Sequence, residues 1–313
     1  YTATAVAKLK AVGAVILTDC NDIALAVANG TVALALGSDT GGCIRRPAAS
    51  AGIVGIKPTY GRVSRYGLVA YASSLEQIGV FSSCVKNLAP ILGVICGQDA
   101  KDNTSSPQPA GDFGEYIGKG VKGKIIGVPK DYAENTEAAL SKLEKEGAIL
   151  KELSLPSLRY AVETYEIISA AEASSNFSRF NGISFGRRSK EAKGLMDTYL
   201  KSRSEGFDSE VKFRIMLGNF VLSSGSYKAY YVQAQKMRRV ITEEFKKAFS
   251  QCDVLATTAP LSQHAALVGV NLAGLPGLVQ PCGKAPAALQ WVGKPFDEAS
   301  LLGIADTLAC LEE

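Results

Sequence analysis

Residues 34–67, LALGSDTGGCIRRPAASAGIVGIKPTYGRVSRYG, join an apolar run to a glycine turn, a cysteine, two arginines and a basic segment that glycines interrupt. The run Thr31–Leu36 is short and apolar and ends at Gly37, which predicts a buried strand that leads into a loop. Glycines after such a strand tolerate positive φ and let another molecule approach the backbone closely, while successive N–H groups can point at one anion. The stretch therefore predicts a strand followed by a turn that presents Cys43.

A turn of this kind suits acyl transfer. We expect Cys43 to supply the attacking atom, and the backbone N–H groups of Thr40, Gly41 and Gly42 to stabilise the oxyanion. A tight turn that packs a small buried cysteine is the structural alternative for these few residues. A phosphate loop does not fit, because no Lys-Ser or Lys-Thr follows Gly42 and the G-x-G-x-x-G pattern is absent.

Composition limits the class of protein further. The 313 residues carry 34 Lys and Arg against 30 Asp and Glu, a formal charge of +4, so any contact with RNA is expected to come mainly through a partner. No stretch approaches the roughly 18–20 apolar residues of a membrane span, and we expect a soluble protein. Seven widely spaced cysteines predict reduced thiols, and a single histidine, His264, argues against a zinc site. If the chain is a hydrolase, either His264 is the base or the base is another residue type.

The pattern of elements predicts an α/β protein. Strands are expected over 14–18, 31–36, 53–56, 124–128 and from Asp253 onward, and helices over 158–177, 190–202, 210–222, 226–249 and 298–311. The polar segment Asp99–Gly114 reads as one surface loop, so the chain is expected to form a single domain over 1–313.

The longer stretch Ala35–Gly79, which runs on through LVAYASSLEQIG, resembles the core signature of the amidase signature family. The similarity resumes in VKFRIMLGNFVLSSGSYKAYYVQAQKMRR (211–239) and in NLAGLPG (271–277). Members of this family are serine hydrolases that use a serine, a cis-serine and a lysine, with no histidine. Within the family the stretch is most similar to the A subunits of tRNA-dependent amidotransferases.

The resemblance implies a mixed central β-sheet covered by helices on both faces, and it assigns roles to particular residues. Cys43 stands where the family has its nucleophilic serine, the turn Thr40–Cys43 forms the oxyanion site, and Arg214 binds the carboxylate of the substrate. The bridging serine corresponds to Asp19, and the lysine belongs to a segment before the counterpart of Tyr1. We expect the domain to lack that N-terminal segment and some internal loops, one of them between GAVIL and ALAVANG.

The function that the resemblance implies is glutamine hydrolysis within an ATP-dependent amidotransferase, a ligase that converts Glu-tRNA(Gln) or Asp-tRNA(Asn) to the amidated form. The partners would be the B and C subunits, with misacylated tRNA bound through the complex and ATP and Mg²⁺ used by a partner. No metal or cofactor is expected in this chain, and the expected location is the cytoplasm or an organelle matrix. The alternatives are a free-standing amidase acting on small amides and a catalytically impaired scaffold subunit.

Overall fold

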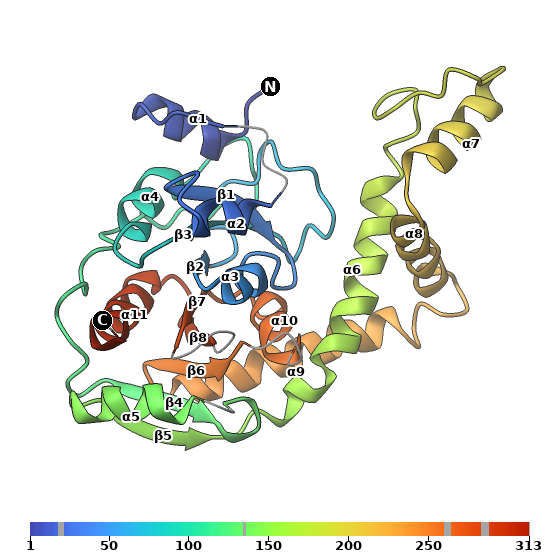
Figure 1. The fold of residues 1–313 in the computed structure, drawn as a ribbon. Coiled ribbons are helices and arrows are strands. Elements are labelled where there is room, and N and C mark those ends of the chain that lie inside the picture. Colours follow the sequence, from blue (N-terminus) through green and yellow to red (C-terminus); the bar gives the residue numbers. More distant parts are fainter. Residues whose placement is uncertain (18–21, 134–135, 260–263, 283–287, 313) are drawn as a thin grey trace. The chain divides into compact units, whose positions relative to one another are not determined.

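The computed structural model describes residues 1–17, 22–133, 136–259, 264–282 and 288–312, and it divides the chain into two compact units (Figure 1). Unit 1 comprises Tyr1–Leu68, Leu75–Val162 and Arg239–Glu313, and unit 2 comprises Val69–Ser74 and Glu163–Arg238. Unit 1 holds the sheet, whereas unit 2 is helical.

The strands of unit 1 form one eight-stranded mixed sheet in the order β1-β3-β2-β7-β8-β6-β4-β5. Their bounds are β1 Leu34–Asp39, β2 Val54–Lys57, β3 Gln77–Ser82, β4 Ile125–Pro129, β5 Ile149–Leu153, β6 Val254–Thr258, β7 Gly277–Pro281 and β8 Ala288–Gly293. β4 pairs in parallel with β5 and β6, and the other pairs are antiparallel. The β2–β7 pair brings the C-terminal part of the chain beside the strand that follows the glycine turn.

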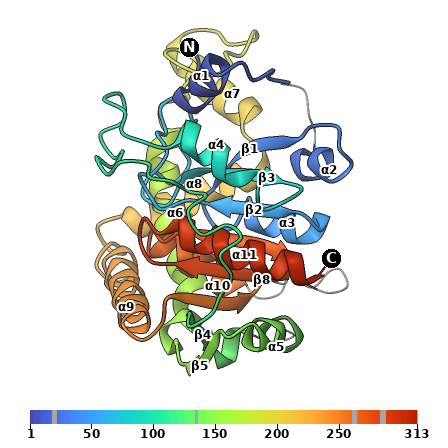
Figure 2. The ribbon, with the colours of Figure 1, turned by 90° about the vertical axis from the view of Figure 1, so that its left-hand side faces the viewer.

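Helices lie on both faces of this sheet, as the resemblance implies. The helices are α1 Thr4–Ala11, α2 Ile23–Ala28, α3 Arg45–Ala51, α4 Leu88–Ile95, α5 Glu137–Lys145, α6 Ala161–Phe177, α7 Leu195–Gly206, α8 Ser209–Leu222, α9 Tyr231–Phe249, α10 His264–Leu272 and α11 Glu298–Glu312, with short 3₁₀ turns at Lys130–Tyr132 and Pro156–Tyr160. Figure 2 shows α4 and α11 in front of the strands. None of the helices in the described part of the chain is long and apolar enough to cross a bilayer.

Successive residues of the buried strands point to opposite faces of the sheet and pack into separate apolar clusters, as the two-residue period of a strand requires. Val80 of β3 and Leu278 of β7 pack with α1, α4, α5 and α11 in the largest apolar cluster. Their neighbours Phe81 and Val279 point into smaller clusters that include residues of α2 and α3. The central part of the sheet is therefore covered on both faces, which explains why buried strands such as β2 and β6 consist of short, largely apolar runs.

One expected strand is missing from unit 1. Residues Ala14–Leu17 of the run AVILT are not part of any strand, and Val15 and Leu17 are exposed. The described part of the apolar run therefore pairs with no strand, and Thr18, the last residue of the expected strand, lies outside the described residues.

Unit 2 consists of α6 from Glu163 onward, helices α7 and α8, and the start of α9. α8 packs closely on α6, because a Cβ at Gly218 would lie 2.1 Å from the carbonyl oxygen of Ala170. The segment Val69–Ser74 is held to α6 as well: Asn176 donates to the Tyr71 carbonyl (3.0 Å), and the Ser74 N–H donates to Glu172 (2.8 Å).

Candidate active site

β1 ends at the glycine turn that the sequence predicts. Gly42 adopts φ +106°, a conformation that side-chain-bearing residues rarely take, so the residue before Cys43 has to be glycine. Thr40, Gly41 and Gly42 are buried, whereas Cys43 is exposed, and α3 begins two residues later. The structure therefore places Cys43 on the accessible side of a tightly held turn.

The side chain of Asp39 holds this turn from inside. Its carboxylate accepts hydrogen bonds from the N–H groups of Gly42 (2.8 Å), Ile44 (3.2 Å) and Arg45 (3.4 Å). Asp39 is fully buried, so these bonds replace the water that a carboxylate would otherwise keep.

Arg45 completes the support of the turn. Its Nε and Nη2 donate to the two oxygens of Asp39 (3.1 and 2.9 Å), and its Nη1 donates to the Leu267 carbonyl (3.0 Å) and to Gln290 Oε1 (2.6 Å). Nη2 also donates to Asn271, whose own amide donates back to Asp39 Oδ1 (3.0 Å). The network thus ties the turn to α10 and β8.

The charge of this network is stable at neutral pH. Burial by itself would raise the pKa of Asp39, but the guanidinium of Arg45, Lys57 and the Asn271 amide together hold that pKa well below its usual range. Asp39 is therefore an acceptor and a counter-ion here, and it does not act as a proton donor.

The support network narrows the set of expected oxyanion donors. The Gly42 N–H is used by Asp39, whereas the N–H groups of Thr40, Gly41 and Cys43 have no acceptor among the described residues. Donors that are fixed in place and lack an internal partner can stabilise a developing oxyanion. The oxyanion role of the turn stays a prediction: the N–H groups of Thr40, Gly41 and Cys43 have no internal acceptor among the described residues, and that of Gly42 is bound to Asp39.

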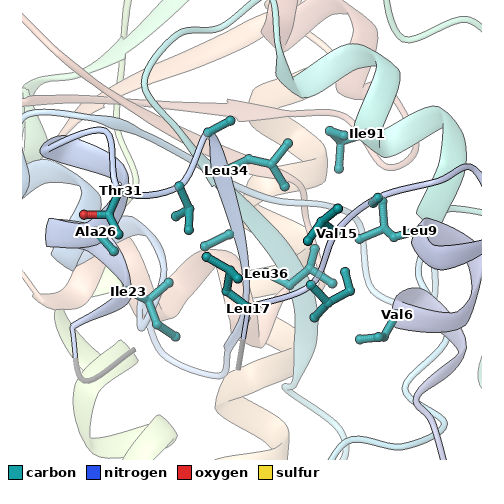
Figure 3. A pocket seen from close by; sticks show the side chains of 15 residues that line it. Val6, Leu9, Val15, Leu17, Ile23, Ala26, Thr31, Leu34, Leu36 and Ile91 are labelled. Carbon is teal, nitrogen blue, oxygen red and sulfur yellow. The ribbon is translucent and has the colours of Figure 1, made fainter. Parts of the chain in front are cut away.

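The described cysteines differ in accessibility. Cys43, Cys84 and Cys310 are exposed, and none of the six cysteines in the described segments is disulfide-bonded. Burial raises the pKa of Cys96 to about 12 and that of Cys252 and Cys282 to about 11, so these thiols stay protonated at neutral pH. Cys43 is not sealed in a core, but the cavity in Figure 3 is lined by other residues, so a pocket above Cys43 stays a prediction.

Lys57 is a buried lysine beside this network. It was not identified from the sequence as a candidate residue. Its Nζ donates to the carbonyls of Pro58 (3.0 Å) and Leu275, which joins the end of β2 to the turn before β7. Burial and the neighbouring Arg45 lower the pKa of Lys57 to about 7. The sequence signal was a lysine at the end of the apolar run IVGIK, where a charge is unusual.

Arg214 lies on α8 in unit 2. Its Nε donates to Glu210 (2.9 Å) and its Nη1 to Glu166, while its Nη2 has no partner among the described residues. Desolvation acts to lower the pKa of this guanidinium, but Tyr71 and the two glutamates raise it overall, so the charge is permanent. Its role as a carboxylate ligand stays a prediction.

The two other residues considered for catalysis are His264 and Asp19. His264 begins α10, and its Nδ1 contacts Nη2 of Arg46. Asp19, which corresponds to the family's bridging serine, lies outside the described residues.

With this geometry established, the chain was compared with known proteins. A family model described as Amidase matches residues 23–302, which include the sheet, the glycine turn, all of unit 2 and most of unit 1. The chain belongs to the amidase family. The resemblance expected from the glycine turn and the segments after it is therefore confirmed.

Among curated amidase relatives, the A subunit of glutamyl-tRNA(Gln) amidotransferase from Persephonella marina is 44% identical, covering 93% of this chain and 66% of that protein. The protein of the same name from Staphylococcus aureus is 48% identical, covering 90% of this chain and 64% of that protein. The chain thus spans 64–66% of the length of these relatives.

A solved relative confirms the fold. The crystal structure of the A subunit of glutamyl-tRNA(Gln) amidotransferase from Thermotoga maritima superposes with a TM-score of 0.79 at 33% identity, covering 98% of this chain and 76% of that one. The expected mixed sheet with helices on both faces is accordingly the amidase signature fold.

Proposed function

We propose that this chain is the amide-hydrolysing part of a tRNA-dependent amidotransferase and releases ammonia from glutamine. The observation that carries the proposal is the turn after β1, where an exposed Cys43 follows three buried residues held by Asp39 and Arg45. Identities of 44–48% to proteins named as amidotransferase A subunits support the choice of glutamine over other amides.

The turn suggests the order of events. The thiolate Sγ of Cys43 attacks the side-chain amide carbon of glutamine, and the negative charge that develops on the amide oxygen is bound by the N–H groups of Thr40, Gly41 and Cys43. The C–N bond then breaks as the proton released from the Cys43 thiol is transferred to the amide nitrogen, which leaves as ammonia, and a glutamyl thioester remains on Cys43. Water hydrolyses the thioester to glutamate and restores the thiol.

Substrate recognition is assigned to Arg214. A guanidinium N–H forms a charge-assisted hydrogen bond with a carboxylate, and Nη2 of Arg214, whose Nε and Nη1 donate to Glu210 and Glu166, is left for the α-carboxylate of glutamine. Glu166 and Glu210 orient the guanidinium, so its remaining donor has a fixed direction.

The proposal includes the partners that the relatives' name implies. As one part of a larger enzyme with B and C subunits, the chain would deliver ammonia to the B subunit, which would use ATP and Mg²⁺ to activate Glu-tRNA(Gln) or Asp-tRNA(Asn). The formal charge of +4 supports an arrangement in which a partner holds the tRNA. We place this reaction in the cytoplasm or an organelle matrix.

Glutamate release from glutamine by the protein with its partner subunits tests the proposal. We expect Cys43→Ala to lower kcat by several powers of ten, since loss of a nucleophile has effects on that scale, and Cys43→Ser to retain or exceed the original rate. Cys84→Ala removes another exposed thiol and should change nothing.

An amidation assay driven by added ammonia separates the alternatives. Loss of glutamate release in every variant while ammonia still supports amidation would make the chain a scaffold subunit. Hydrolysis of small amides in the absence of other subunits would make it a free-standing amidase.

A further inference from the structure

Arg46, in the first turn of α3, has no carboxylate partner among the described residues. The other three arginines between positions 45 and 65 each pair with a carboxylate: Arg45 with Asp39 (2.9 Å), Arg62 with Glu298 (3.4 Å) and Arg65 with Asp102 (3.7 Å). The Nε of Arg46 is buried without an acceptor in the described part of the chain, and its Nη1 has none there either. A buried donor of this kind is rare in folded proteins and is commonly satisfied by a water or an ion.

Arg46 follows Cys43 by one helical turn. Its backbone N–H donates to the Gly42 carbonyl (2.8 Å), which is the hydrogen bond of an α-helix, so the helical path of α3 already begins at the glycine turn. Side chains three positions apart on such a path lie on the same side, with their Cβ atoms about 5–6 Å apart. The guanidinium therefore belongs to the surroundings of the exposed Cys43 thiol, within unit 1.

His264, the first residue of α10, contacts this guanidinium. Its Nδ1 meets Nη2 of Arg46, and because an arginine nitrogen can only donate, Nδ1 is the acceptor. An imidazole that accepts at Nδ1 keeps its proton on Nε2 and carries no charge. One turn later in α10, Leu267 lies against the glycine turn, since a Cβ at Gly42 would lie 3.4 Å from the Leu267 Cβ. The contact with His264 therefore orients Arg46 beside the turn without neutralising its charge.

We propose that Arg46, oriented by His264, forms a binding site for a small carboxylate or another oxyanion beside the Cys43 thiol. A guanidinium makes charge-assisted hydrogen bonds with carboxylate and phosphate oxygens, and the described chain leaves Nε and Nη1 of Arg46 unused. This site lies in unit 1, whereas Arg214, to which the α-carboxylate of glutamine is assigned, lies in unit 2. The inference does not depend on the proposed glutaminase activity.

Two alkylating agents of similar size and different charge test the site. Iodoacetate carries a carboxylate and iodoacetamide a neutral amide, so the ratio of their rates at one thiol reports the charge beside that thiol. We expect Arg46→Gln to lower this ratio at Cys43 by about threefold or more, because it removes a charge a few ångströms away in a largely aqueous setting. Arg46→Lys keeps the charge and should retain most of the ratio. Peptide mass mapping follows each thiol.

A second thiol and a second arginine provide the controls. Cys84 is exposed in the same sample, and its ratio should be the same in every variant. Arg159→Gln removes an exposed arginine of unit 1 and should leave the ratio at Cys43 unchanged. These controls separate a charge beside Cys43 from the net charge of the chain.

Protection by added anions identifies the ligand. Glutarate, added at constant ionic strength, should slow the alkylation of Cys43 by neutral iodoacetamide in a saturable way, and Arg46→Gln should abolish this protection. His264→Ala should weaken it, because the guanidinium loses the contact that orients it. Inorganic phosphate is the second probe: protection by glutarate alone assigns the site to the carboxylate of an organic ligand, and equal protection by phosphate assigns it to oxyanions in general.

Three results would overturn the proposal. Equal rate ratios at Cys43 in the original chain and in Arg46→Gln would show that the guanidinium does not lie beside the thiol. Absence of protection by both anions would show that the charge binds no ligand. Protection that appears only in Asp19→Asn would make Asp19, which lies outside the described residues, the carboxylate partner of Arg46.

Discussion

At the scale of single residues, the geometry of the turn depends on the buried carboxylate of Asp39. Asp39 binds three N–H groups of the turn and both donor arms of Arg45, and all of these atoms are buried. A buried ion pair contributes little to the free energy of unfolding when compared with a well-packed apolar pair. Removing one partner is costly, however, because it leaves the other charge buried without a counter-ion or water. The pair therefore fixes the turn more than it stabilises the fold.

Asp39→Ala should lower the free energy of unfolding by about 3–5 kcal/mol, since it leaves Arg45 buried without its counter-ion. Urea denaturation measures the effect. Lys294→Ala breaks a half-exposed pair with Asp253 and should cost about 1 kcal/mol or less. Equal losses in the two variants would mean that the Asp39 pair is not solvent-excluded.

Lys57 gives the stability a pH dependence with a defined sign. Its pKa is about 7 in the folded chain against 10.5 in the unfolded chain, so between these values only the unfolded state holds the proton. The free energy of unfolding should therefore rise with pH from about 7 to 10.5, by a few kcal/mol in total. Denaturation of the original chain and of Lys57→Met at pH 6.5 and 9.5 isolates this contribution, and a difference that does not change with pH would contradict it.

At the scale of elements, the sequence predicts best where a segment's own periodicity decides its structure. The helices of 161–177, 209–222 and 231–249 follow from apolar residues at three- and four-residue spacing, and β1, β2, β4 and β6 follow from short apolar runs. β3, β7 and β8 were not predicted, because glutamine and glycine interrupt their apolar pattern. Their pairing partners lie far away in the chain, as in the β2–β7 pair.

The start of α11 shows how distant elements fix the segment after β2. Glu298 is fully buried, and its Oε1 accepts hydrogen bonds from the N–H (2.9 Å) and hydroxyl (2.7 Å) of Thr59, while Oε2 lies 3.4 Å from Arg62 Nε. Glu298→Ala should destabilise the chain by about 3 kcal/mol or more, because it leaves Arg62 buried without its counter-ion. Glu152→Ala, at an exposed pair with Lys130, serves as the control and should cost less than about 1 kcal/mol. A small loss at Glu298 would show that water reaches this site.

At the scale of the whole molecule, the sequence led to the family and singled out Cys43 as the candidate nucleophile, whereas the network that supports its turn emerged only from the fold. Asn271 and Gln290 lie more than 200 residues after Arg45, and no local pattern marks them as its partners. The sequence likewise does not predict the division into two units. The boundaries fall within helices α6 and α9, so no linker segment marks them.

Arg214→Ala tests the proposed role of Arg214 in binding the carboxylate of glutamine. A charge-assisted hydrogen bond contributes about 1.5–3 kcal/mol, so the KM for glutamine should rise about 10- to 100-fold with a smaller change in kcat. Arg187→Ala removes another arginine of unit 2 that pairs with a glutamate and should leave KM unchanged. An unchanged KM in Arg214→Ala, with the fold intact by circular dichroism, would remove Arg214 from the site.

Direct labelling of the nucleophile tests the central claim. A glutamine analogue with a diazoketone in place of the side-chain amide alkylates an attacking thiol with loss of N₂, and peptide mapping locates the thioether. We predict modification of Cys43 that excess glutamine prevents, with exposed Cys84 and Cys310 unmodified in the same sample. Inactivation by the analogue with the label on any other residue, or labelling of Cys43 that glutamine does not prevent, would contradict the assignment of Cys43 as the nucleophile.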